Sequence, residues 1–134
     1  MRILVVDDDR SVCEAIRICL ETEGFDVVVA GNGHEGLAAL GGSSFDLLLL
    51  DIFMPGMDGL EMIEAFRRRA PATPIIAMSG YMFLSGSART PEFLDMSTKI
   101  NSDYNLAKPF KPADVMKAVR ACLGLGLAAP RKAG

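Results

Sequence analysis

The residues of this sequence that could do chemistry are mostly acidic, and they follow apolar runs. Asp7, Asp8 and Asp9 come directly after the run at residues 3–6. Asp51 comes directly after the all-leucine run at residues 47–50. Carboxylates that are brought together repel one another, and a divalent cation relieves that repulsion. Their oxygens are hard ligands, so such a cluster favours Mg²⁺ over zinc or copper and leaves coordination positions for phosphate oxygens.

Two more polar residues occupy similar places in the sequence. Ser79 and Lys108 each follow a further short apolar run. The segment Asp7 to Asp9 alone could also be a capping run at the start of a helix, where acids complement the helix dipole. That interpretation does not explain why Asp51, Ser79 and Lys108 also follow apolar runs.

The elements that must position these residues can be predicted from the apolar pattern. Short apolar runs, which suit strands buried in a sheet, alternate with segments whose apolar residues recur at helical spacing. We predict strands at residues 3–6, 25–30, 47–50, 74–78 and 104–107, and helices at 11–23, 33–40 (ended by Gly41 and Gly42), 60–69, 92–100 and 112–123. This alternation predicts an α/β domain, a five-stranded parallel sheet with helices on both faces. Ligands of such sheets lie outside the carboxyl ends of the strands, where the polar residues would meet.

The composition fits one globular domain. The chain has 134 residues, of which 50% are hydrophobic, and a net charge of −3. These values exclude an acidic disordered chain and argue against a surface built to bind nucleic acid. Cys13, Cys19 and Cys122 lack C-x-x-C spacing, so we expect buried thiols and no disulfide framework or zinc site. With no apolar run of membrane-spanning length and no signal peptide, we expect a cytoplasmic protein without a membrane or direct nucleic-acid partner.

Four motifs carry a resemblance to a known family. They are Ile3-Leu4-Val5-Val6-Asp7-Asp8-Asp9, Asp51-Ile52-Phe53-Met54-Pro55-Gly56-Met57-Asp58-Gly59, Met78-Ser79-Gly80 and Ala107-Lys108-Pro109-Phe110. In this order and spacing they resemble a response-regulator receiver domain of two-component signalling, the family that includes the single-domain chemotaxis regulator. The resemblance covers about residues 2–123. It implies a flavodoxin-like (βα)5 receiver fold over residues 1–123 and a short flexible tail at 124–134.

The resemblance implies a phosphoryl-transfer role for three residues. Asp51 would be the phosphoacceptor, a carboxylate nucleophile that takes a phosphoryl group from a histidine kinase or a histidine phosphotransfer protein. Lys108 would pair with phosphoryl oxygens, and Ser79 would donate a hydrogen bond to one of them. Such a protein is not an enzyme in its own right, although it assists its own phosphorylation and dephosphorylation.

The same resemblance implies an Mg²⁺ cofactor. Asp8 would bind the ion directly, and Asp7 would act mostly through a water molecule. Asp51 and the backbone carbonyl of Phe53 would complete the ligands that the protein supplies.

Phosphorylation would add charge beside Ser79 and Lys108, and the elements that carry them would pass the change on. We expect the output surface on the face formed by the helix at 92–100, the strand at 104–107 and the last helix. This face would bind a downstream protein effector or form a homodimer. No DNA-binding module follows Leu123, so we expect output by protein contact, phosphorelay or self-association, unless the chain was cut from a longer protein.

Two features depart from the family pattern. Asn105 stands where the family usually has an aromatic residue, and Tyr104 lies one residue earlier. Neighbouring strand residues alternate faces, so Tyr104 is expected to point the other way. The separation of Ser79 and Lys108 is also longer than usual, and the surplus falls at residues 81–90. We interpret this loop as a lid, a partner contact or an ordinary variable insertion.

Two other functions stay open from the residues alone. A small phosphatase of the aspartate-nucleophile class would use Asp7 as the nucleophile and Asp9 as the acid. A flavodoxin-like cofactor carrier would bind its ligand at the same edge of the sheet, although an acidic loop is a poor cradle for phosphate.

Overall fold

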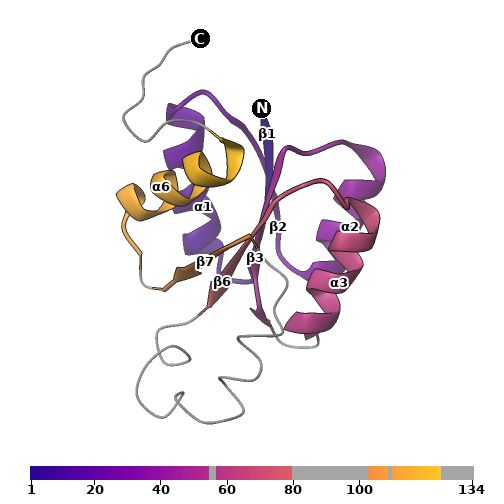
Figure 1. Cartoon of the computed structure of the whole chain (residues 1–134). Helices are drawn as coiled ribbons and strands as arrows, with labels where there is room; N and C mark the ends of the chain where they lie inside the picture. The colour runs from indigo at the N-terminus through magenta and orange to yellow at the C-terminus, as the bar shows by residue number, and fades with distance from the viewer. Residues whose placement is uncertain (55–56, 80–102, 109, 125–134) are drawn as a thin grey trace.

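A computed structural model of the chain describes residues 1–54, 57–79, 103–108 and 110–124. Five strands form one parallel sheet in the order β2-β1-β3-β6-β7, with helices on both faces (Figure 1). The strands are β1 (Arg2–Val6), β2 (Asp26–Ala30), β3 (Leu47–Asp51), β4 (Phe53–Met54), β5 (Met57–Asp58), β6 (Ile75–Ser79) and β7 (Tyr104–Ala107). The helices are α1 (Arg10–Thr22), α2 (Gly33–Gly42), α3 (Gly59–Arg69) and α6 (Pro112–Leu123). The predicted α/β class and parallel sheet are confirmed.

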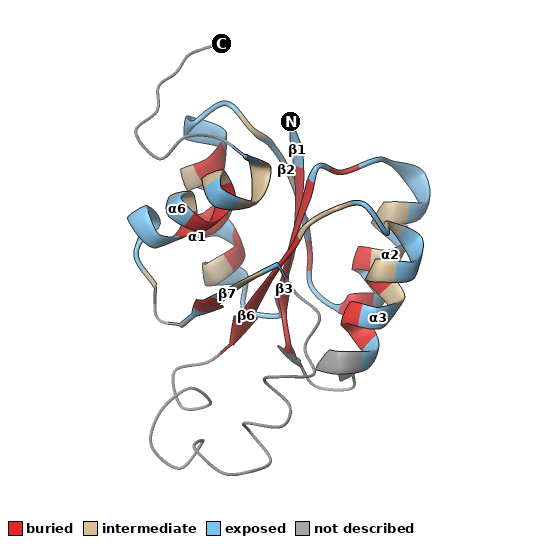
Figure 2. Ribbon diagram, viewed as in Figure 1, coloured by how far each residue is buried: buried red, intermediate tan, exposed pale blue. Residues whose placement is uncertain are grey.

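The central strands are apolar throughout because both of their faces are covered. Residues Ile3–Val6 and Leu47–Leu50 are all fully buried, and Figure 2 shows the buried residues along the centre of the sheet and on the helix sides that face it. Strand residues alternate between the two faces, so Leu47 and Leu49 join one hydrophobic core while Leu48 and Leu50 join the other. A leucine run that would also permit a helix therefore forms a strand that links two cores.

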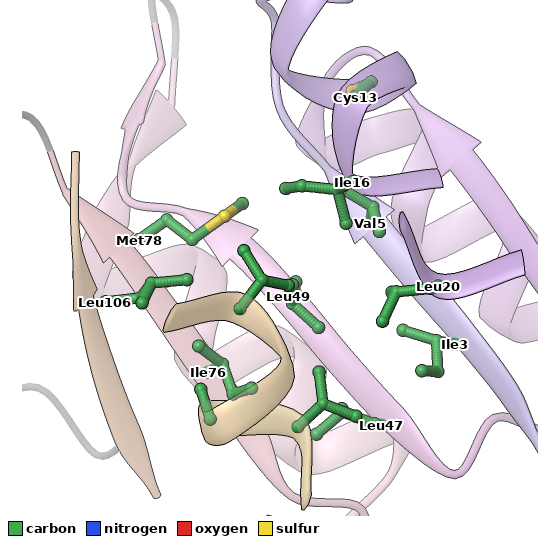
Figure 3. Packing of buried hydrophobic residues seen from close by; sticks show 13 residues of the cluster. Ile3, Val5, Cys13, Ile16, Leu20, Leu47, Leu49, Ile76, Met78 and Leu106 are labelled. Carbon is green, nitrogen blue, oxygen red and sulfur yellow. The ribbon is translucent and has the colours of Figure 1, made fainter. Parts of the chain in front are cut away.

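Each core pairs one face of the sheet with two helices. The first contains residues of α1 and α6, and Figure 3 shows Cys13, Ile16 and Leu20 of α1 facing the side chains of β1. The second contains Met62, Ile63 and Phe66 of α3, with partly buried residues of α2 packed against it. This three-layer packing fixes the strands in register, so their carboxyl ends lie along one edge of the sheet.

Several local predictions differ from the structure. The two glycines do not end the second helix: α2 continues through Gly42 and is followed by Ser43 at its C-terminal cap. Glycine lowers helix stability without forbidding the conformation, and a Cβ at Gly41 or Gly42 would meet no atom of the described residues within 4 Å. An antiparallel pair, β4 with β5, lies where only a turn was expected, because arms of two residues are too short to show a period.

Some predictions concern residues outside the described ranges. They are the loop at 81–90, the helix at 92–100 and the tail beyond Gly124. Among the helices that the structure describes, none has the length and apolar character needed to cross a membrane.

Candidate functional site

The four predicted site positions lie at the same edge of the sheet. Asp7 follows the end of β1, Asp51 and Ser79 are the last residues of β3 and β6, and Lys108 follows β7. The parallel register brings these ends together, because Asp51 is paired with Met78 and Ser79 with Ala107. Residues separated by up to about a hundred positions in the sequence therefore meet at one place. This place is the carboxyl edge of the sheet, where parallel α/β sheets bind their ligands.

The three consecutive aspartates divide into two roles. Asp9 is the N-cap of α1, and its Oδ1 accepts hydrogen bonds from the backbone N–H groups of Ser11 at 2.9 Å and Val12 at 3.3 Å. The capping interpretation is therefore correct for Asp9. Asp7 is buried beneath this turn, and its Oδ1 accepts from the N–H of Asp9 at 2.9 Å. Asp8 is exposed, so it can meet a ligand that arrives from solvent.

Asp7, Asp8 and Asp51 form a cluster that fits a divalent cation. One carboxylate oxygen from each residue lies within 4.8 Å of the other two. Asp7 Oδ2 is fully buried and makes no hydrogen bond among the described residues, although Lys108 forms an ion pair with it. Three carboxylate oxygens are a donor set that suits Mg²⁺. The residues present therefore fit the cofactor that the sequence predicts, and the role of the Phe53 carbonyl stays a prediction.

Lys108 supplies a positive charge to the acidic cluster. Its Nζ lies 2.7 Å from Asp7 Oδ2 and 3.3 Å from Asp51 Oδ2. The contact with Asp51 is a hydrogen bond, whereas the contact with Asp7 is an ion pair whose angles fall outside hydrogen-bond geometry. Partial burial lowers the pKa of Lys108, but the contact with Asp7 and the charge of Asp51 outweigh it, so the pKa is raised above its ordinary value. The lysine is thus held protonated between two carboxylates.

Ser79 is connected to Lys108 through the backbone. The N–H of Lys108 donates to the carbonyl oxygen of Ser79 at 2.7 Å, and Ser79 is buried at the end of β6. A displacement of either residue therefore acts on the other. The structure places Ser79 at the site edge, and hydrogen bonding of its hydroxyl to a phosphoryl group stays a prediction.

The environment of Cys13 adds a contact that the sequence did not predict. Its thiol, which is 3% exposed, donates to the backbone carbonyl of Asp7 at 3.3 Å. Burial, and then the charge of Asp7, raise the pKa of this thiol from 9.0 to about 11. The prediction of a buried thiol is confirmed for Cys13, whereas Cys19 and Cys122 are only partly buried. The one feature of the sequence that could have indicated this contact is the position of Cys13, in the first turn of the helix that follows the aspartates.

Tyr104 and Asn105 of β7 lie on opposite faces of the strand, as the alternation of strand side chains predicts. Tyr104 is half-buried against the core beneath α6, whereas Asn105 is exposed. The aromatic ring therefore packs against this core and does not occupy the position of Asn105.

Comparisons with known proteins agree with this geometry. The model of the response regulator receiver domain family matches residues 3–120. The DNA-binding response regulator MtrA of Mycobacterium tuberculosis is 39% identical over 91% of this chain and 50% of its own length. The transcriptional activator protein PfeR of Pseudomonas aeruginosa is 39% identical over 85% of this chain and 35% of its own length. The chain thus spans half or less of the length of these curated relatives.

Solved structures show the same fold. A CheY-like receiver domain protein from Methanospirillum hungatei matches with a TM-score of 0.79 and 32% identity, over 92% of this chain and 93% of its own. The chemotaxis response regulator CheY4 of Vibrio cholerae matches with a TM-score of 0.76 and 28% identity, over 91% of this chain and 98% of its own. The resemblance inferred from the four motifs is therefore confirmed, and the chain belongs to the response regulator receiver domain family.

Proposed function

We propose that this chain is a phosphoacceptor switch of a two-component or phosphorelay system, in which Asp51 takes a phosphoryl group from a phosphohistidine. One observation carries the proposal: the Asp51 carboxylate lies within 4.8 Å of Asp7 and Asp8 while Lys108 lies 3.3 Å away. Positive charge and metal ligands around a carboxylate nucleophile are what phosphoryl transfer requires of a protein. Membership of the receiver family supports the same role.

The transfer exchanges one bond of phosphorus for another. An Asp51 carboxylate oxygen attacks the phosphorus, the P–O bond to Asp51 forms, and the P–N bond breaks so that the electron pair leaves with the imidazole of the donor. Lys108 turns from the two carboxylates toward the phosphoryl oxygens, and Ser79 donates a hydrogen bond to one of them. Bound Mg²⁺ would neutralise charge on the carboxylates and on the phosphoryl oxygens. Asp7, Asp8 and Asp51 would hold it, with the carbonyl of Phe53 as the further ligand.

The signal arises because the new charge on Asp51 competes for Lys108. The hydrogen bond from the N–H of Lys108 to Ser79 ties the ends of β6 and β7 together, so movement of the lysine acts on both strands. The output surface that we propose comprises the segment at 92–100, β7 and α6. A downstream protein effector, or a second copy of the chain, is the partner for this surface.

The relatives and the thiols bear on partners and location. The relative MtrA is a DNA-binding response regulator, and this chain matches half of its length. For the receiver domain itself we propose protein partners, as membership of the receiver family suggests. These partners are a histidine kinase or phosphotransfer protein upstream and an effector downstream. Three free cysteines support a reducing, cytoplasmic setting. The chain would act as a self-assisting phosphoacceptor and not as an enzyme.

Acetyl phosphate with Mg²⁺ tests the proposal directly. We expect a base-labile adduct of one phosphoryl group on Asp51, observed by mass spectrometry and absent in Asp51→Asn or in EDTA. Asp9→Asn is the matched control, because asparagine also caps helices and this variant should be phosphorylated like the parent. An adduct on Asp7 would instead support the aspartate-nucleophile phosphatase. Flavin absorbance in the purified protein would support the cofactor carrier.

A further inference from the structure

The thiol of Cys13 links helix α1 to the acidic cluster. Its Sγ lies 3.3 Å from the backbone carbonyl oxygen of Asp7, six residues earlier in the chain. A polar side chain inside a helix usually bonds to a carbonyl three or four residues back, within the same helix. Cys13 instead reaches past the start of α1 at Arg10, to the residue that follows β1. The thiol therefore joins the helix to a residue of the candidate metal site.

The carbonyl of Asp7 depends on this thiol for a donor. Asp7 lies just beyond Val6, the last residue of β1 that is paired with β2 and β3. Within the described ranges no backbone N–H donates to the Asp7 carbonyl, and the residue is 1% exposed. A buried carbonyl that lacks a donor costs free energy. The Cys13 thiol thus supplies the hydrogen bond that the sheet no longer supplies at this position.

The other polar groups of Asp7 are also held by contacts. Its N–H donates to the carbonyl of Ala30 at 3.1 Å, and its Oδ1 accepts from the N–H of Asp9 at 2.9 Å. Its Oδ2 forms the ion pair with Lys108. Because the backbone on both sides of the Asp7 side chain and one of its carboxylate oxygens are fixed, the direction of Oδ2 toward the cluster is fixed as well. Cys13 provides one of the contacts that set this direction.

Cys13 is itself held in place by the core. Its N–H donates to the carbonyl of Asp9 at 3.1 Å, and the residue is 3% exposed. It belongs to the hydrophobic core that contains Val5 and Ile16, and Figure 3 shows these side chains between α1 and β1. A side chain whose position is locked by packing can fix the group to which it donates. The hydrogen bond to Asp7 is therefore anchored in the core.

We propose that Cys13 is a positioning residue of the Mg²⁺ site: its thiol, through the Asp7 carbonyl, holds the Asp7 carboxylate in the geometry that binds the ion. This inference rests on the proposed function, because the ion is the Mg²⁺ of the phosphoacceptor site. Partners that orient metal ligands typically contribute tenfold or more to metal affinity. A thiol is a weak donor, so the effect of Cys13 lies at or below the lower end of that range.

Calorimetric titration with Mg²⁺ tests the proposal without relying on phosphorylation. Cys13→Ala should bind the ion about five- to tenfold more weakly than the parent, whereas Cys13→Ser, which keeps a donor, should recover most of the affinity. Ile16→Val is the matched control, because it removes a methylene from the same core and no hydrogen bond to Asp7. It should bind Mg²⁺ like the parent.

Three calorimetric results would overturn the proposal. The first is a Cys13→Ala variant that binds Mg²⁺ as tightly as the parent. The second is a Cys13→Ser variant as weak as Cys13→Ala, because the donor would then not matter. The third is an equal loss of affinity in Ile16→Val, because core packing and not the hydrogen bond would then set the affinity.

Phosphorylation by acetyl phosphate separates this inference from the proposed function. In Cys13→Ala the Mg²⁺ concentration that gives half the maximal rate should rise about five- to tenfold, while the maximal rate stays within about twofold of the parent. A lower maximal rate at an unchanged half-saturating concentration would contradict a role through the metal ligand. If the parent gained no phosphoryl group on Asp51, the proposed function would fail, and calorimetry with Mg²⁺ would still decide the role of Cys13. A parent that binds no Mg²⁺ would overturn both.

Discussion

At the scale of single residues, the site is a balance between one cation and several anions. Lys108 lies between Asp7 and Asp51, so the charge that would meet a phosphoryl group already neutralises part of the cluster. A metal ion that binds there must share these carboxylate oxygens with the Lys108 ammonium or displace it. The same lysine is therefore expected to hinder metal binding and to assist phosphorylation.

We predict that Lys108→Gln binds Mg²⁺ about five- to tenfold more tightly than the parent, because an internal positive charge has been removed from the metal site. Calorimetric titration gives the affinity without relying on activity. The rate of phosphorylation by acetyl phosphate should fall in the same variant. Lys117→Gln, which changes an exposed lysine of α6, is the control and should leave both quantities unchanged. Weaker Mg²⁺ binding by Lys108→Gln would contradict the competition described above.

A second residue-scale prediction concerns the buried thiol of Cys13. Its pKa is raised from 9.0 to about 11, first by burial and then by Asp7, so the folded state favours the neutral thiol. This stabilisation is complete below pH 9 and is lost as the pH rises through 11, and it amounts to about 2–3 kcal/mol. Cys13→Ser keeps a donor but does not titrate. Urea unfolding in EDTA should show that the difference in unfolding free energy between parent and variant shrinks from pH 8 to pH 11. A difference that stays constant with pH would contradict the raised pKa of Cys13.

At the scale of elements, close packing between α2 and α3 is the clearest constraint. A Cβ at Gly36 would lie 2.8 Å from Phe66 Cζ and 2.8 Å from Val6 Cγ2, both in a packed core. Gly41 belongs to the same helix, and within the part of the chain that the structure describes a Cβ there would have no atom within 4 Å. One helix therefore contains a glycine that packing requires and a glycine that it does not.

We predict that Gly36→Ala destabilises the fold by about 1–3 kcal/mol, because the added methyl group must displace core side chains. Gly41→Ala should instead stabilise it by about 0.5–1 kcal/mol through better helix propensity and a less flexible unfolded chain. Urea unfolding of both variants measures the two values. Equal effects of the same sign would show that helix propensity, and not the contact with Phe66, governs Gly36.

The elements also show what the sequence can and cannot predict. The apolar runs predicted the five strands, because strands buried on both faces need continuous apolar residues. The predicted site positions followed from those strand ends and the parallel rule. The ion pairs Arg67–Asp103 and Arg120–Glu23 could not be predicted, because they join residues 36 and 97 positions apart through tertiary packing. The extension of α2 and the β4–β5 pair were not predicted for a local reason. Glycine disfavours a helix without excluding it, and arms of two residues are too short to show a strand period.

At the scale of the whole molecule, the acidic cluster connects metal binding to global stability. Carboxylates held within 4.8 Å of one another repel in the folded chain and are far apart in the unfolded one. The fold therefore tolerates an electrostatic cost at its functional edge, as proteins commonly do at sites that await a ligand. Mg²⁺ should remove this cost, since it binds the folded cluster and has no comparable site in the unfolded chain.

We therefore predict opposite effects of Asp8→Asn with and without the ion. In EDTA the variant should be more stable than the parent by about 0.5–1 kcal/mol, because one repelling charge is gone. At an Mg²⁺ concentration about 100 times the dissociation constant, the parent should gain about 2.7 kcal/mol and the variant much less, so their order reverses. Thermal unfolding of both proteins in EDTA and in Mg²⁺ measures this reversal. Asp26→Asn, at the amino end of β2 and away from the cluster, should respond to Mg²⁺ like the parent. If Asp8→Asn kept the full gain from Mg²⁺, this aspartate would not be a ligand, and the ion would have to be held by Asp7 and Asp51 without it.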